Sequence, residues 1–403
     1  MFADLWAELL PIGRDDNTGG YRRYAWTEAD MTCRAWFART ATQLGLRTDC
    51  DGNGNLWAWW GRPGEQAAVV TGSHLDSVPD GGAYDGPLGV VSAFAAIGRL
   101  RSSGFRPARP IAVAAFTEEE GARFGVACLG SRLLTGAIDT AAARQLRDGE
   151  GIALAQAMQQ AGRDPSLLGP DDGLMSGLGA YIELHIEQGS ALAGLGAAVG
   201  VADRIWPHGR WRLDFTGRAD HAGTTRLADR RDPMLPFAAT VLAARATAER
   251  LGALATVGKV ITEPGASNAI SAAVHCWLDA RAPDEEILDQ VVAGVWAAAV
   301  DTARQHGVQA SRSAESVTPG VSFDAVLRDR IVGVLGAAGL PAPVLATGAG
   351  HDAGVLASRV PAAMLFVRNP SGVSHSPAEH ADPADCEAGV TALAAVLADL
   401  AGE

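Results

Sequence analysis

The sequence predicts an α/β protein with a mixed, doubly wound sheet into which a ferredoxin-like α+β domain is inserted. From residue 67 onward, apolar runs rich in β-branched residues alternate with helical segments, as in βαβ units. The chain has 403 residues. One hydrophobic core rarely exceeds roughly 250–300 residues, so two domains are expected.

The first part of the chain is predicted to be helical before the sheet begins. Thr27, Glu28 and Asp30 supply an acidic first turn for the second helix. The run Ala67-Ala68-Val69-Val70 is typical of a strand buried on both faces. The predicted elements are helices over 1–10 and 27–46, a hairpin over 52–60, a strand over 67–72, a helix over 88–100, a strand over 110–117, helical sequence within 140–170 and a strand over 181–186.

The sequence pattern changes at about residue 206. The next elements follow the order β-α-β-β-α-β, which is ferredoxin-like. Apolar and polar residues alternate along their strands, which predicts a sheet with one face exposed to solvent. We therefore expect an inserted domain at 207–318, and a first domain made of 1–206 and 319–403. The inserted domain is predicted to have strands over 211–215, 255–262, 272–282 and 308–313 and helices over 232–251 and 284–306; the returning part has helices over 324–339, from 351 and over 383–400, and strands over 343–348 and 362–367.

Composition argues against several classes of function. The formal net charge is −13 and no run of Lys and Arg offsets it locally, which argues against a nucleic-acid or anionic-membrane partner. No stretch approaches the roughly 18 apolar residues of a membrane span, and the first residues do not resemble a signal peptide, so a cytoplasmic protein is expected. The five cysteines are scattered without a Cys-x-x-Cys pair, which predicts neither disulfides nor a thiolate zinc site.

The segment 67–90 carries the first candidate site. It leads from the predicted buried strand into a loop with His74, Asp76 and Asp85, at the carboxyl edge of the sheet. Glycines bracket Asp85 and allow the backbone to aim this carboxylate back toward His74. In the His-x-Asp pattern, Asp76 can hold one ring nitrogen of His74 while the other binds a metal. Taken alone, the segment is equally compatible with a Gly/Asp-rich turn that contains an incidental histidine.

Other ligand-type residues follow further strands of the same predicted sheet. Three consecutive glutamates end the strand over 110–117, although alone they would be typical of a solvated loop. The stretch YIELHIEQG places acidic and imidazole side chains on one face, where unpaired charges are costly unless a cation compensates them. Imidazole and carboxylate without thiolate suit zinc, manganese, cobalt or nickel, and one bridging carboxylate would allow two ions. The candidates are His74, Asp85, Glu119, Glu120, His185 and His375.

Six motifs spread over the chain resemble one family. They are GSHLDSVPDGGAYDGPLGV, FTEEEGARFG, ELHIEQG, DHAGTT, RRDP and GVSHSPAEH. In order and spacing they are similar to the hydantoinase/carbamoylase branch of the dinuclear-metal amidase and aminopeptidase superfamily, which includes N-carbamoyl-L-amino-acid hydrolases, β-ureidopropionases and allantoate amidohydrolases. The resemblance covers nearly the whole chain and implies an aminopeptidase-like catalytic domain, with 207–318 as its lid and dimerisation domain.

The resemblance implies a centre with two divalent metal ions per chain. Asp85 would bridge them, with His74 and His185 on one or the other ion. Glu119 matches the general base, which takes a proton from the attacking water and later returns it to the departing nitrogen. Asp76 matches the residue that supports a ligand histidine. The implied metal ligands are His74, Asp85, Glu120, His185 and His375.

In the inserted domain the resemblance implies contacts with the substrate. His221 matches a residue that stabilises the oxyanion, while Asn268 and Arg281 match residues that hold the substrate carboxylate. Gln188, after the ligand strand, matches a further substrate contact. In such enzymes some lid residues reach the active site of the partner subunit, so a homodimer is expected. Without the resemblance, His221 would be interpreted as a surface histidine and Arg281 as a solvated strand end.

The expected reaction is hydrolysis of a ureido acid, either an N-carbamoyl-L-amino acid or allantoate, to ammonia and carbon dioxide. An N-acyl-amino-acid deacylase or dipeptidase of the same superfamily is the alternative, and a non-catalytic metal or amino-acid binding protein is a more remote one. His185 in HIEQG favours the carbamoylase branch, because many peptidase relatives carry an acidic ligand there. Arg226 stands where the family commonly has proline after HAGTT, which leaves the substrate's identity open.

Overall fold

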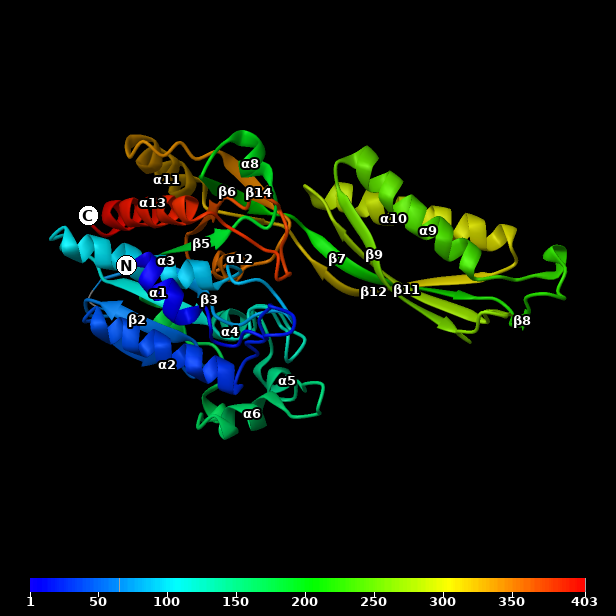
Figure 1. The fold of residues 1–403 in the computed structure, drawn as a ribbon, viewed down its shortest axis with the longest axis horizontal. Coiled ribbons are helices and arrows are strands. Elements are labelled where there is room, and N and C mark those ends of the chain that lie inside the picture. Colours follow the sequence, from blue (N-terminus) through cyan, green and yellow to red (C-terminus); the bar gives the residue numbers. More distant parts are fainter. Residues whose placement is uncertain (65, 403) are drawn as a thin grey trace. The chain divides into compact units, whose positions relative to one another are not determined.

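The computed structural model describes residues 1–64 and 66–402, and the chain divides into two compact units. Unit 1 comprises Met1–Asp203 and Ser322–Glu403, and unit 2 comprises Arg204–Val321. Figure 1 follows the chain through them from blue to red. The boundaries differ by three residues from those expected from the sequence (203 against 206, and 321 against 318). No helix in the described part of the chain has the length and apolar character that a membrane crossing requires.

A mixed sheet forms the centre of unit 1. Within residues 1–64 and 66–402 it has nine strands, in the order β1-β2-β4-β3-β5-β15-β6-β13, with β14 paired to β6. The central strands β3, β4, β5 and β15 run parallel, whereas β1, β2 and β6 pair antiparallel with their neighbours. The strands are β1 (Arg47–Cys50), β2 (Leu56–Trp60), β3 (Ala68–His74), β4 (Ile111–Phe116), β5 (Leu178–Ile186), β6 (Val199–Ile205), β13 (Val321–Ser322), β14 (Val344–Thr347) and β15 (Ala362–Val367).

The register of the parallel strands brings the candidate residues to one edge of the sheet. Every residue of β3 and β4 is buried, as expected for strands covered on both faces. His74, at the end of β3, lies opposite Phe116, at the end of β4. Glu183 of β5 lies opposite Gly72 of β3, so His185 emerges at the same edge. The loops that follow these strands therefore meet at this carboxyl edge.

Helices cover the sheet and complete two hydrophobic cores. The larger core joins apolar residues of the central strands to five helices, and the smaller core lies around α4, α5 and α6. This arrangement confirms the α/β class and the doubly wound sheet. The helices of the larger core are α1 (Phe2–Leu9), α2 (Glu28–Gln43), α3 (Pro87–Ser102), α11 (Ala325–Ala337) and α13 (Pro383–Ala401); the remaining helices are α4 (Leu129–Thr135), α5 (Thr140–Arg144), α6 (Leu154–Gln160), α7 (Asp172–Ser176), α8 (Ala191–Leu195) and α12 (Asp352–Leu356).

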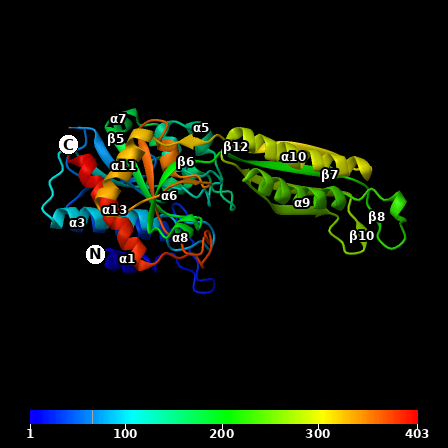
Figure 2. The same ribbon diagram turned by 90° about the horizontal axis from the view of Figure 1, so that it is seen from above.

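Unit 2, which the structure describes in full, has the predicted ferredoxin-like order. Its four-stranded antiparallel sheet runs β12-β7-β11-β9, and α9 and α10 pack together on it. A small two-stranded sheet, β8-β10, lies beyond the ends of these helices in Figure 2. The elements are β7 (His208–Thr216), β8 (Asp220–His221), α9 (Met234–Leu251), β9 (Leu254–Glu263), β10 (Ala269–Ile270), β11 (Ala273–Arg281), α10 (Glu285–Gln305) and β12 (Gln309–Thr318).

Candidate metal centre

One carboxylate, that of Asp85, lies among three histidines. Its Oδ1 is 3.6 Å from Nε2 of His74 and 3.2 Å from Nε2 of His185, and its Oδ2 is 3.4 Å from Nε2 of His375. The same nitrogen of His375 is 3.6 Å from Oε2 of Glu120. Two groups of ligand-type residues therefore share Asp85, and in each group the ligand atoms lie within 4.8 Å of one another. The groups are His74, Asp85 and His185, and Asp85, Glu120 and His375.

Two glycines allow the loop after β3 to fold onto the site. Gly86, at a φ of +85°, lies between Asp85 and the first residue of α3, and a Cβ at this position would lie 2.4 Å from ring atoms of His74. At Gly82 a Cβ would lie 2.4 Å from Oε1 of Glu379. Any side chain at these positions would push the loop away from the histidine or from Glu379. The predicted sharp bend toward His74 is therefore present.

The donor atoms of this cluster fit divalent cations. Nδ1 of His185 lies 2.9 Å from the carbonyl oxygen of Ile186, and Nδ1 of His74 lies 3.2 Å from that of Asp76. Because carbonyl oxygens only accept, each Nδ1 carries a proton, and Nε2 is the ring atom that can offer a lone pair to a metal. Both Nε2 atoms are buried without a hydrogen-bond partner, as is Oε1 of Glu120. Unsatisfied buried imidazole and carboxylate groups of this kind are suited to a bound metal.

The charges in the cluster are strongly coupled. Burial would raise the pKa of Asp85, but the neighbouring imidazoles of His185, His375 and His74 hold it well below its usual value. Burial would likewise lower the pKa of His74, yet Glu119, Asp76 and Asp85 together raise it well above the ordinary value for histidine. Without metal, protons on the imidazoles therefore balance the carboxylates, and divalent cations would displace those protons on binding.

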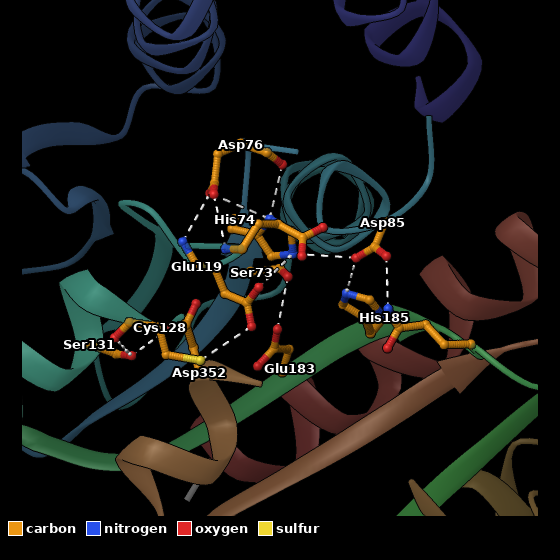
Figure 3. A network of polar contacts seen from close by, with 12 residues as sticks. Ser73, His74, Asp76, Asp85, Glu119, Cys128, Ser131, Glu183, His185 and Asp352 are labelled. Carbon is orange, nitrogen blue, oxygen red and sulfur yellow. Dashed lines mark hydrogen bonds and ion pairs between the residues drawn. The ribbon is translucent and has the colours of Figure 1, made fainter. Parts of the chain in front are cut away.

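Glu119 stands beside the cluster without belonging to either ligand group. Its Oε2 is 3.6 Å from Nε2 of His74, and burial raises the pKa of its carboxyl well above the usual value. Asp76 holds the backbone that carries it, since the amides of Glu119 and Glu120 donate to the Asp76 carboxylate at 3.2 and 3.0 Å. The expected support of His74 is weaker, with Oδ1 of Asp76 3.5 Å from Nδ1. Figure 3 shows the contacts of Asp76 with His74 and with Glu119.

Glu183 of β5 forms a third ligand-type group with His185 and His351. Its carboxylate already accepts a hydrogen bond from the Ser73 hydroxyl at 2.8 Å (Figure 3) and another from the Ala353 amide at 2.9 Å. His185 presents only Nε2 for a metal, and that atom faces Asp85. We therefore interpret Glu183 as a residue that holds the end of β5 in place through these hydrogen bonds, and not as a metal ligand.

Gln188, which was predicted to contact the substrate, also contacts two of the ligand-type residues. Its side-chain amide donates to Oδ2 of Asp85 at 2.8 Å and lies 3.4 Å from Nε2 of His375. Every predicted site residue of unit 1 thus comes together in one place. His221, Asn268 and Arg281 belong to unit 2.

A model of Peptidase family M20/M25/M40 matches residues 70–399. The chain belongs to this family. It is 36% identical over 397 residues to an N-carbamoyl-L-amino acid amidohydrolase of Geobacillus stearothermophilus, and the match covers 96% of both chains. It is also 31% identical to an allantoate amidohydrolase of Bacillus subtilis, and this match covers 95% of this chain and 93% of the other. A hydantoinase/carbamoylase family amidase structure from Burkholderia multivorans covers 100% of this chain and 97% of its own, at 31% identity and a TM-score of 0.90. The predicted family and the expectation of a hydrolase are confirmed.

Within unit 2 of this M20 family chain, His221 and Asn268 lie together. The amide of Ala222 donates to the Asn268 carbonyl at 3.1 Å, next to the β8-β10 pairing. Nδ1 of His221 accepts the amides of Gly223 and Thr224 at 2.9 and 3.2 Å. Its Nε2 consequently carries the proton and is available as a donor. The exposed Arg226 pairs with Asp229 at 2.6 Å.

Glu379, in the last of the six motifs, supports the centre and was not predicted to. Its Oε1 accepts the amides of Tyr84 and Asp85 at 3.0 and 2.9 Å, and its Oε2 lies 3.1 Å from the Ser374 hydroxyl. It thereby ties the loop of Asp85 to the loop of His375. The motif GVSHSPAEH contains this residue, but hydrogen bonds to backbone amides across about three hundred positions leave no local pattern in a sequence.

We expect Glu379→Ala to destabilise the metal-free chain by about 2–4 kcal/mol, because two buried amides lose their acceptor. Glu379→Gln keeps an oxygen for these amides and should cost clearly less. Denaturant unfolding of the whole chain, monitored by tryptophan fluorescence, measures the difference. Equal stability of the alanine variant and the parent chain would contradict this role.

Proposed function

We propose that this chain hydrolyses a ureido acid, an N-carbamoyl-L-amino acid or allantoate, and releases ammonia and carbon dioxide. The observation that carries the proposal is the pair of ligand groups sharing Asp85, with Glu119 beside them. The names of the relatives, an N-carbamoyl-L-amino acid amidohydrolase and an allantoate amidohydrolase, supply the substrate class. We propose two divalent ions, zinc, manganese, cobalt or nickel, held by these two groups.

In this proposal the metals, when bound, acidify a water molecule and polarise the carbamoyl oxygen. Glu119 accepts the proton of the attacking water at Oε2, the oxygen that faces His74, and later delivers it to the leaving nitrogen. His221 donates a hydrogen bond from its Nε2–H to the developing oxyanion and keeps the proton. Asp76 holds Glu119 and Glu120 in position by accepting hydrogen bonds from their backbone amides.

Asn268 and Arg281 are proposed to hold the substrate carboxylate. A guanidinium binds a carboxylate through two parallel hydrogen bonds, and this distinguishes a ureido acid from a neutral amide. In the structure the Nε of Arg281 donates to Asp279 at 3.0 Å, which fixes the direction of its side chain. Gln188 is proposed as a further substrate contact from unit 1.

The geometry of unit 2 supports a homodimer. Asn268 precedes the start of β11, whereas Arg281 is its last residue. A strand of this length separates its two ends by about 26 Å, which exceeds the length of the proposed substrates. One substrate therefore contacts both residues only if they come from different subunits. The exposed edge strand β9, with Val260 and Ile261 outward, and the 72% exposed Leu242 of α9 offer apolar surface for that contact.

Mixing two inactive variants tests this arrangement. We expect Glu119→Gln and Asn268→Ala each to be inactive alone, and to regain up to about a quarter of the parent activity after unfolding and refolding together. The reason is that random pairing makes about half of the dimers mixed, and one of the two sites in each mixed dimer then carries neither substitution. Glu119→Gln mixed with Glu119→Ala is the matched control. Failure of the first mixture to exceed the control would contradict a shared site.

The alternative activity is that of an N-acyl-amino-acid deacylase or dipeptidase, which shares the same metal chemistry. Product analysis separates the two. We would offer manganese-loaded protein allantoate, N-carbamoyl-β-alanine, several N-carbamoyl-L-amino acids, N-acetyl amino acids and dipeptides in parallel. Ammonia from a ureido acid is the expected result, and amine release from the acyl or peptide substrates alone would replace the proposal with the alternative.

We extend the proposal to a cytoplasmic location. All five cysteines are free, and four of them are buried. Free thiols are stable in a reducing compartment, where disulfides seldom form. Fractionation of cells that produce the chain, with an antibody against it, tests this point.

A further inference from the structure

A buried thiol that the proposed mechanism does not use lies against Glu119. Sγ of Cys128 is 3.3 Å from Oε1 of Glu119, and the two residues are 3% and 5% exposed. Among the residues that the structure describes, this thiol is the only hydrogen-bond donor to the Glu119 carboxylate. Figure 3 shows Cys128 approaching Glu119 from the side opposite to His74.

The backbone fixes the thiol in this position. The amide of Cys128 donates to the carbonyl of Glu119 at 2.6 Å, and the next two amides, of Leu129 and Gly130, donate to the carbonyls of Glu118 and Thr117. Cys128 itself has a φ of +54°, in the left-handed region that non-glycine residues seldom adopt. This conformation turns the chain into α4 and places the side chain against the carboxylate.

The two carboxylate oxygens of Glu119 have different neighbours. Oε1 accepts the thiol, while Oε2 faces Nε2 of His74 and the ligand groups at 3.6 Å. A thiol is a weak donor, so it fixes the orientation of a carboxylate without greatly reducing its proton affinity. Asp352, another buried carboxylate nearby, has its own donor in the Ser131 hydroxyl at 2.5 Å.

We propose that Cys128 is a positioning residue that holds Glu119 through its S–H group, so that Oε2 points at the site of proton transfer. This inference rests on the proposed role of Glu119 as general base. Among the described residues, no hydrogen bond joins the Cys128 thiol to the two ligand groups, so Cys128 is expected to affect kcat and to leave KM and metal content alone.

Kinetics of three variants test the positioning. Cys128→Ala should lower kcat about tenfold, the rate equivalent of one orienting hydrogen bond, with KM and metal content unchanged. Cys128→Ser restores a donor of nearly the same size and should recover most of the loss. Cys386→Ala, which removes another buried thiol in α13, controls for the deletion of a core sulfur. Equal kcat in Cys128→Ala and Cys128→Ser, or in Cys128→Ala and Cys386→Ala, would overturn the inference.

Infrared spectroscopy tests the contact without any substrate. The difference between the parent chain and Cys128→Ala isolates the S–H stretching band of Cys128. This band should shift in Glu119→Ala, which removes the acceptor, and an unshifted band would overturn the inference. Because this measurement needs no activity, a chain that failed to hydrolyse ureido acids could still show the contact. Conversely, hydrolysis with an unshifted band would remove only the role of Cys128.

Discussion

Replacing Glu119 with glutamine is expected to lower kcat by at least about 1,000-fold while the metal content of the chain stays the same. Glutamine keeps the size of the side chain, and its carbonyl oxygen can still accept the thiol of Cys128, but an amide takes up no proton at neutral pH. Glu119 belongs to neither ligand group, so both ions should remain bound. Steady-state kinetics and elemental analysis of the same preparation measure both quantities.

Glu118→Gln is the matched control for this substitution. Glu118 is the neighbouring buried glutamate, but it belongs to neither ligand group, and its carboxylate accepts the amides of Arg123 and Phe124 at 2.8 and 2.6 Å. Burial raises the pKa of Glu118 to about 8, so its carboxyl is largely neutral at pH 7 and an amide resembles it. Its kcat should stay within about threefold of the parent. A Glu119→Gln enzyme as active as Glu118→Gln would contradict the assignment of the general base.

The second large effect concerns metal content. Asp85→Ala should bind essentially no metal, because both ligand groups lose the carboxylate that they share, whereas His375→Ala should keep about one ion per chain. The ion that remains in His375→Ala would be held by His74, Asp85 and His185. Both variants should lose turnover. Equilibrium dialysis followed by elemental analysis counts the ions.

His380→Ala provides the control for the loss of an imidazole in the same loop. His380 is exposed, lies 3.1 Å from Asp382 and belongs to no ligand group. It should bind as much metal as the parent chain. One ion retained by Asp85→Ala would show that Asp85 does not bridge, and two ions retained by His375→Ala would show that His375 is not a ligand.

Much of the fold follows from local sequence patterns. The fully buried strands β3 and β4 are apolar runs, and the alternating strand β11 shows its period of two directly in the sequence. By contrast, β6 was not predicted, because its run VGVADRI is interrupted by the charged Asp203 and Arg204 and its partner β15 lies far along the chain. Strand β12 is longer than the predicted 308–313, because its polar second half pairs with β7 along the whole length of that strand.

The ligand-type residues were predictable for a topological reason. They follow strands that run parallel in one sheet, so the sheet itself brings His74 and His185 together. The position of Asp85 needed a second signal, the glycines around it, one of which allows the chain to pass against the ring of His74.

The supporting contacts could not be predicted in the same way. Asp76 was expected to serve His74, yet its carboxylate mainly accepts backbone amides of Glu119 and Glu120. Glu379 and Cys128 likewise act on backbone or side-chain atoms of loops whose paths depend on the whole fold. In unit 2 the separation of Arg281 from Asn268 becomes evident only from the strand register.

A metal titration tests most directly whether hydrolysis of a ureido acid by this chain depends on two metal ions that share Asp85. Protein stripped of metal would receive increasing manganese, and ammonia release from allantoate and from N-carbamoyl-L-amino acids would be recorded at each step. We predict no release without metal and a rise that reaches its maximum at two equivalents per chain. Full activity in the stripped protein, or a maximum at one equivalent, would contradict the shared dinuclear centre.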